Sequence, residues 1–254
     1  MMSRLRKLVL AATASAAAPA LAQSCPPPLD AALRLVLVTT AGMGSSNARL
    51  QLFERSSAAK PWLAVTEGEP AMVGKNGLAW GFAFLGYKRE GEPEKVEGDK
   101  RTPAGFFRIG PSFGFADAAR NGHVKVEPGQ TVCVEDPASP LYNTITTRAQ
   151  LGAQTKADNM ADTSLFRNGL FVDYPSDRAT HRGSCIFIHV WKTPDTKTSG
   201  CVALPEPRVE ALQDFSEAGA VLGVLPETAR ERFAGCLPVT IAPTDDDTVI
   251  APKP

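Results

Sequence analysis

The hydrophobic and polar positions of the chain predict short β-strands in its first part. Residues 33–40 are rich in aliphatic and β-branched side chains, and residues 49–54 alternate apolar and polar positions with a period of two. Another short strand is expected around residues 62–65, after a break at Pro61. These three segments predict a meander of antiparallel strands.

The clearest strand covers residues 185–191, which read CIFIHVW. Apolar residues occupy both of its faces, as is typical of a strand in the centre of a sheet. Helical spacing appears between Pro205 and Gly219, and a late strand is expected at residues 220–225. The pattern predicts a mostly β fold, of the β-rich α+β kind, with one or two short helices.

The segments between these strands are more polar. Residues 90–101 (EGEPEKVEGDKR) are predicted to form a solvated loop, and residues 102–105 (TPAG) a turn that precedes the next strand. Short strands are expected near residues 131–134 and 169–173, whereas residues 158–164 read as a loop.

The first 22 residues predict export. Basic residues within 4–7 precede the apolar, alanine-rich residues 8–18, and Ala-Leu-Ala at residues 20–22 is a small-x-small cleavage pattern. The apolar run is too short for a permanent membrane span. The alternative is an ordinary N-terminal helix. We expect a signal peptide over residues 1–22 and an exported mature protein.

The composition excludes some classes of function. Lys and Arg number 27 and Asp and Glu also 27, and no basic patch with interleaved aromatic residues is present, so nucleic acid is not an expected partner. No later apolar run reaches membrane length. We expect one domain over residues 23–240 and a polar tail over residues 241–254. The sequence leaves the oligomeric state open.

Five cysteines follow the predicted cleavage site: Cys25, Cys133, Cys185, Cys201 and Cys236. An odd number leaves at least one thiol unpaired, and two disulfides with one free thiol is the simplest arrangement in an oxidising compartment. Cys25 and Cys236 lie near the two ends of the domain and are a candidate pair. Cys201 is the candidate free thiol.

His189 and Cys201 frame the segment GSCIFIHVWKTPDTKTSGCVAL, residues 183–204. Three interpretations compete: a core histidine with an inert thiol, a metal site that includes Cys185, and a thiolate nucleophile with a histidine base. Four residues along a strand span about 13 Å, whereas zinc ligands lie about 2.0–2.3 Å from the ion. This spacing disfavours the metal site.

Nucleophilic catalysis explains more of the pattern. A free thiol has a pKa of about 8.5 and needs a base near neutral pH, and a histidine within hydrogen-bond reach supplies one. His189 ends a buried strand, and Cys201 follows a polar loop that would expose it to substrate. Gly200 permits a close backbone approach, so that nearby amides can face a developing oxyanion.

These residues resemble the L,D-transpeptidase catalytic domain, or YkuD-like family. Its pattern is an apolar strand ending in His, a loop, and Ser/Thr-x-Gly-Cys, matched here by residues 186–189 and 198–202. Residues 98–106 (GDKRTPAGF) are similar to the family's Gly-Asp-x-x-Thr-Pro-x-Gly turn, which leads a strand toward the active site. The resemblance spans residues 33–235.

The resemblance implies a β-sandwich or barrel that acts on peptidoglycan stem peptides in the periplasm or cell wall, without a cofactor or metal. It implies that Cys201 is acylated as a thioester and that His189 is its base, oriented by a backbone carbonyl. Ser199, Gly200 and Cys201 would frame the oxyanion site through their amides. The acyl acceptor would be an amine.

The sequence departs from the family pattern at two positions. Many members have His and Arg where this chain has Ser199 and Ala203. A hydrolase with water as acceptor, and a non-catalytic wall-binding protein, therefore stay open.

The remaining candidates have less specific roles. Trp191 could wall the substrate cleft or be a core or rim aromatic. Cys185 is expected to be structural, with Cys133 as a candidate partner. His123 and His181 lie in polar stretches and are expected at the surface.

Overall fold

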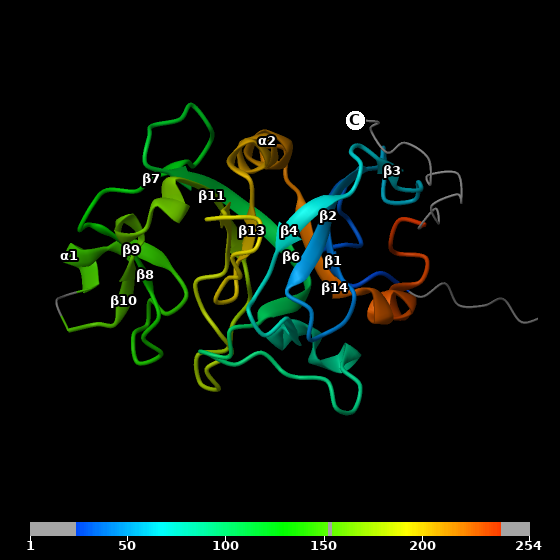
Figure 1. Cartoon of the computed structure of the whole chain (residues 1–254), viewed down its shortest axis with the longest axis horizontal. Helices are drawn as coiled ribbons and strands as arrows, with labels where there is room; N and C mark the ends of the chain where they lie inside the picture. The colour runs from blue at the N-terminus through cyan, green and yellow to red at the C-terminus, as the bar shows by residue number, and fades with distance from the viewer. Residues whose placement is uncertain (1–23, 152–153, 240–254) are drawn as a thin grey trace, which may run out of the picture.

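The computed structural model describes residues 24–151 and 154–239 (Figure 1). The predicted signal peptide at residues 1–22 and the predicted tail at residues 241–254 lie outside the described residues.

Strands make up most of the regular structure, in agreement with the predicted mostly β fold. They are β1 (Arg34–Thr40), β2 (Asn47–Glu54), β3 (Leu63–Ala64), β4 (Glu69–Met72), β5 (Leu78–Trp80), β6 (Thr102–Gly114), β7 (Val124–Lys125), β8 (Thr131–Val134), β9 (Ile145–Thr147), β10 (Ala157–Asn159), β11 (Asn168–Asp173), β12 (Phe187–Val190), β13 (Val202–Leu204) and β14 (Val221–Pro226). The helices are α1 (Arg148–Leu151), α2 (Glu206–Ser216) and the 3-10 helices η1 (Phe82–Tyr87), η2 (Met160–Asp162), η3 (Ser164–Arg167) and η4 (Glu227–Phe233).

The main sheet closes on itself as a barrel. Its strands follow the order β1-β14-β6-β11-β12-β13-β4-β2, and β2 pairs with β1 in turn. β3 extends the sheet from β2 and confirms the predicted antiparallel meander of the first three strands. The closure leaves each barrel strand paired on both sides, and it confirms the sandwich or barrel that the resemblance implied.

A small second sheet lies to one side of the barrel. It has the order β10-β8-β9, and Figure 1 shows it together with α1 beyond β11 and β13. A second core cluster lies in this region. Its buried members come from both sheets and from the segments between their strands; they are Phe113, Val126, Cys133, Met160, Phe166 and Phe187. Cys201 packs against this cluster, so the small sheet contributes to its surroundings.

The central strand β12 is shorter than the predicted residues 185–191. All four of its residues are buried, as the apolar pattern indicates. The strand cannot begin at Cys185, because this residue has a φ of +56°, in the left-handed region rather than the extended one.

The predicted turn at residues 102–105 is wrong. These four residues are buried and begin β6, which continues for 13 residues to Gly114. The first three, residues 102–104, pair in parallel with β5, while Gly105 pairs with Val224 of β14. The chain turns earlier, at Lys100, which has a φ of +56°.

The predicted loop at residues 90–101 is largely solvated, but not every charge faces water. Lys95 is only 3% exposed, and its Nζ lies 2.7 Å from Asp99 Oδ1. The prediction that all charges of this loop are merely solvated is therefore wrong for this pair. The predicted loop at residues 158–164 also contains regular structure, namely part of β10, the helix η2 and the first residue of η3.

Helix α2 begins and ends close to the predicted boundaries. Pro205 is its N-cap, and Gly219, with a φ of +88°, follows its C-terminal end. The apolar residues Val209 and Leu212 are buried as their spacing predicts. The late strand is also confirmed, as β14 covers Val221–Pro226.

The cysteines pair as the sequence suggested. Cys25 is bonded to Cys236, and Cys133 to Cys185. Among the described residues, Cys201 is the free cysteine. Because Cys133 lies in β8 and Cys185 just before β12, the second disulfide joins the small sheet to the barrel.

Candidate active site

His189 lies in β12, and Cys201 directly precedes β13, the adjacent parallel strand. β12 pairs with β13 in a register that places His189 opposite Ala203, two residues beyond Cys201. Side chains along a strand alternate between its faces, so residues two apart share a face. His189, Ala203 and Cys201 accordingly line one cavity of about 490 Å³.

The other residues proposed from the sequence lie around the same cavity. Ser199, Gly200 and Trp191 all contribute to its lining. Ser199 is exposed, Gly200 is buried, and Trp191 is half-buried at the rim. Charged residues of both signs complete the walls; they are Lys95, Glu97, Lys100, Glu135, Lys156, Asp158, Lys192 and Lys197.

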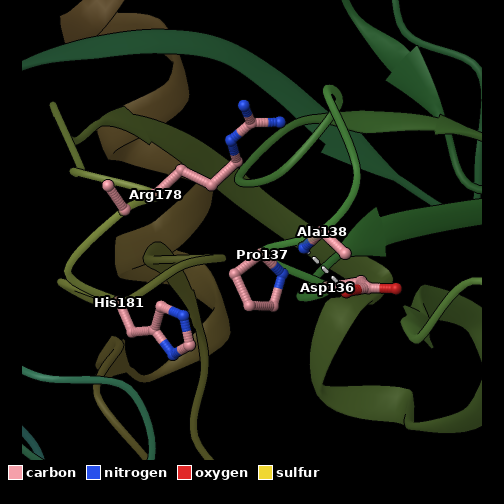
Figure 2. Close-up of a pocket in the computed structure, with 6 residues that line it drawn as sticks. Asp136, Pro137, Ala138, Arg178 and His181 are labelled. Carbon is pink, nitrogen blue, oxygen red and sulfur yellow. Dashed lines mark hydrogen bonds between the residues drawn. The ribbon is translucent and has the colours of Figure 1, made fainter.

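A separate depression of about 580 Å³ shares no lining residue with this cavity. Figure 2 shows its lining, with Asp136, Arg178 and His181 as the ionisable groups. Asp136 Oδ1 accepts the N–H of Ala138, and Arg178 donates to the carbonyl of Ser139. It contains neither Cys201 nor His189, so the candidate active site is the first cavity.

His181 is exposed, as predicted, whereas His123 is half-buried and bonded to Ser112 Oγ at 2.8 Å.

The Cys201 thiol is held by backbone groups. Its Sγ accepts the N–H of Phe187 at 3.4 Å and donates to the carbonyl of Cys185 at 3.5 Å. Burial raises the pKa of Cys201 to about 12, against the smaller lowering effects of the Phe187 N–H and of Lys95. At rest the sulfur is therefore a protonated thiol.

The imidazole of His189 is oriented by a backbone carbonyl, as the resemblance implied. Nδ1 lies 2.8 Å from the carbonyl oxygen of Val190. A carbonyl only accepts, so Nδ1 carries the proton and Nε2 is left as a free acceptor. The ring of Phe166 packs edge-on against the imidazole, with ring centroids 5.3 Å apart. Burial lowers the pKa of His189, so it is neutral near pH 7 and can accept a proton.

Two threonine hydroxyls hold the backbone of Cys201. Thr198 Oγ1 donates to the Cys201 carbonyl at 2.6 Å and accepts the N–H of Gly200 at 3.1 Å. Thr102 Oγ1 donates to the same carbonyl at 3.2 Å and accepts the N–H of Gly74 at 2.9 Å. The two family-like motifs therefore meet at one carbonyl oxygen. Both threonines lie within the motifs that the sequence shows, but their role at this carbonyl depends on the fold.

Gly200 allows the loop to pass close to the start of β6. Its φ is +152°, and a Cβ at this position would lie 3.2 Å from the carbonyl oxygen of Arg101. Because the N–H of Gly200 is bonded to Thr198, this amide does not point freely into the cavity. The amides of Ser199 and Cys201 have no hydrogen-bond partner within residues 24–151 and 154–239.

The YkuD model, which describes the L,D-transpeptidase catalytic domain, matches residues 47–241. The chain belongs to this family. The match covers both strands of the candidate site and both threonines, and it confirms the resemblance seen in the sequence. Comparison with curated proteins gave no match.

The family is one of enzymes that act on peptidoglycan. Within the described part of the chain, no helix is long and apolar enough to cross a membrane.

Other residues near the site gave little signal in the sequence. Phe166 comes from η3, far along the chain from His189, and Lys95 comes from a loop that reads as solvated. Asn143, whose Oδ1 accepts the N–H of Cys185 at 2.9 Å, lies in a weakly patterned stretch. Their proximity to the site depends on the fold.

Proposed function

We propose that the protein is an exported cysteine acyltransferase that cross-links peptidoglycan stem peptides through a thioester on Cys201. One observation carries the proposal: the free thiol of Cys201, directly before β13, and the imidazole of His189, in the neighbouring strand β12, line one cavity. Membership of the L,D-transpeptidase family gives the reaction class.

Acylation begins from a neutral pair, because burial disfavours both the thiolate and the imidazolium. His189 Nε2 takes the thiol proton as Sγ attacks the carbonyl carbon before the terminal D-residue. The C–N bond then breaks, and the imidazolium gives its proton to the leaving amine. The products are a thioester on Cys201 and a free D-amino acid.

Deacylation reverses these roles. The amine of an acceptor stem peptide attacks the thioester carbonyl and gives a proton to His189. The C–S bond breaks, and the sulfur recovers a proton from the imidazolium. The Val190 carbonyl keeps Nδ1 protonated throughout, so that Nε2 can exchange the proton in both halves of the reaction.

The oxyanion of each tetrahedral intermediate needs donors that are not already bonded. The free amides of Ser199 and Cys201 meet this requirement, whereas the amide of Gly200 serves by holding Thr198. In this proposal Gly200 supports the oxyanion site through the shape of the loop. Trp191, half-buried at the rim, is proposed to contact the substrate.

We propose a periplasmic or cell-wall location for the mature protein. The predicted signal peptide supports it, as do the two disulfides, because disulfides persist in oxidising compartments.

The test is product analysis with purified tetrapeptide muropeptides. The mature protein should yield a cross-linked dimer that has lost one terminal D-residue. Mass spectrometry of the intact protein should show a transient mass increase from the acyl group on Cys201. Cys201→Ala should abolish both, and His189→Gln should lower the rate of acylation. The matched control is Ser57→Ala, at an exposed position outside the cavity lining. A tripeptide without dimer would identify water as the acceptor. Products that persist in Cys201→Ala would refute the proposal.

A further inference from the structure

The Cys201 thiol is held by two backbone groups of one short segment, residues 185–187. The N–H of Phe187 donates to Sγ, and Sγ donates to the carbonyl of Cys185. These contacts act in opposite directions, because an N–H donor stabilises a thiolate and a carbonyl oxygen stabilises a protonated thiol. The Cys185 carbonyl therefore helps to position the resting thiol and orients its proton.

Cys185 has a backbone conformation that needs support from outside its own segment. Its φ of +56° is uncommon for a residue with a side chain. Two contacts maintain it: the disulfide to Cys133 in β8, and the hydrogen bond from its N–H to Asn143 Oδ1 at 2.9 Å.

Asn143 is itself held in place by two further hydrogen bonds. Its φ is +62°, a conformation that asparagine tolerates better than most residues. Its N–H donates to the carbonyl of Val134, at the end of β8, at 2.8 Å. Its Nδ2 donates to the carbonyl of Tyr174, beyond β11, at 2.8 Å. Both supports of Cys185 thus start from β8 or the loop that follows it, in the small sheet (Figure 1).

We propose that the Cys133–Cys185 disulfide and the Asn143 side chain are positioning groups for Cys201. They fix the Cys185 carbonyl from the small sheet, and this carbonyl holds the thiol in place for attack. The inference rests on the proposed function, in which Cys201 is the nucleophile. In this proposal the small sheet contributes to catalysis by positioning Cys201, without contacting the substrate.

Other charged groups around the thiol must be kept separate from this effect. Asp158 and Glu135 raise the pKa of Cys201 and Lys95 lowers it, while His189 lines the same cavity. Asp158 lies in β10, and Glu135 follows β8, so loss of the disulfide could move both carboxylates. Variants of Asn143 leave the disulfide in place and so isolate the contribution of the carbonyl.

The first experiment removes each disulfide in turn. Cys133→Ser with Cys185→Ser should lower kcat about tenfold to a hundredfold, as expected for a displaced nucleophile, with KM nearly unchanged. The pH midpoint of Cys201 alkylation by iodoacetamide should fall by about one unit or more. Cys25→Ser with Cys236→Ser is the matched control, and it should retain both kcat and the midpoint. Circular dichroism establishes that each variant is folded under the assay conditions.

The second experiment separates the side chain of Asn143 from its backbone conformation. Asn143→Gly keeps the positive φ and removes both side-chain hydrogen bonds, so kcat and the alkylation midpoint should fall in the same sense as above. Asn143→Asp keeps an acceptor for the Cys185 N–H but loses the donor to the Tyr174 carbonyl and adds a negative charge, so it should recover only part of kcat.

Folded Cys133→Ser/Cys185→Ser and Asn143→Gly proteins with the parental kcat and the parental alkylation midpoint would overturn the inference. Alkylation needs no turnover, so it reports on the positioning of the thiol even with no substrate present. Turnover by Cys201→Ala would count against the proposed function instead, and the two failures are therefore distinguishable.

Discussion

His189 is in register with Ala203 on the neighbouring parallel strand, and not with Cys201. Cys201 directly precedes β13, and it lines the same cavity as His189. Ala203 is buried at the position where many family members carry arginine. The side chain beside the imidazole is therefore small and uncharged in this protein, and the cavity takes its charges from loops and from the small sheet.

Replacement of Thr198 should reduce turnover without unfolding the protein. Thr198→Val removes the hydroxyl that bridges the Gly200 N–H and the Cys201 carbonyl. A loosened loop should lower kcat about tenfold or more, since small displacements of a catalytic group are costly. Thr198→Ser keeps the hydroxyl and should retain most of the activity. Steady-state kinetics check this, with exposed Thr193→Val as the control, and equal rates for the valine and serine variants would contradict it.

Gly200 should tolerate no side chain. Gly200→Ala forces a φ of +152° on a residue with a Cβ and brings that Cβ to 3.2 Å from the Arg101 carbonyl. Backbone strain of this kind costs about 1–3 kcal/mol, so urea unfolding should show a lower midpoint. Gly86→Ala is the control, because a Cβ there meets no atom within 4 Å. If both variants unfolded at the parental urea concentration, the account of Gly200 would be wrong.

The stability of the protein should decrease in mild acid because of His189. Burial places the pKa of this imidazole below its ordinary value of 6.5. Below about pH 6.5 the unfolded chain therefore binds more protons at this residue than the folded one, and the free energy of unfolding falls as the pH decreases. Urea titrations between about pH 5 and pH 8 should show this dependence, and His189→Gln should flatten it. If the free energy of unfolding of His189→Gln depended on pH as strongly as that of the parent, the prediction would be wrong. His181→Gln is the control for loss of an exposed imidazole.

The opposite dependence is expected in alkali. Burial raises the pKa of Cys201 to about 12, far above an ordinary thiol. Above about pH 8.5 the unfolded chain loses the thiol proton while the folded chain keeps it, so the free energy of unfolding falls as the pH rises. Cys201→Ala should lessen that fall in urea titrations from pH 8 to 10. An identical decline in both proteins would show that the thiol is not the cause.

The buried pair of Lys95 and Asp99 should contribute strongly to stability. Lys95→Met would leave Asp99 without its cation in a site where the lysine is 3% exposed. Loss of one partner from a buried pair costs about 3–5 kcal/mol. Thermal unfolding should show a clear decrease in Tm, whereas Lys125→Met, at an exposed pair with Asp117, should change it little. Similar Tm values for the two variants would mean that the buried pair has no special role.

Much of the fold and of the candidate site could be predicted from local pattern. Apolar runs located β1, β2, β11, β12 and β14, because these strands bury the side chains that the pattern marks. The two motifs identified His189 and Cys201, because a histidine near the end of a buried strand and a cysteine after a polar loop form a recognisable pair. The errors at residues 102–105 and at Lys95 have one cause. Pro, Gly and charged residues read locally as turn and surface, whereas parallel pairing with β5 and the carboxylate of Asp99 hold them inside.

The sequence by itself determined the chemistry available: a thiol, an imidazole, two family motifs and an odd number of cysteines in a chain with a predicted signal peptide. The tertiary structure decided how these groups meet. The register of β12 on β13 and the carbonyl of Cys185 beside the thiol join separate segments of the chain, and the pairing of β1 with β14 joins its first and last strands. Local patterns record which side chains prefer burial, but pairings between distant segments depend on the packing of the whole barrel and of the small sheet beside it.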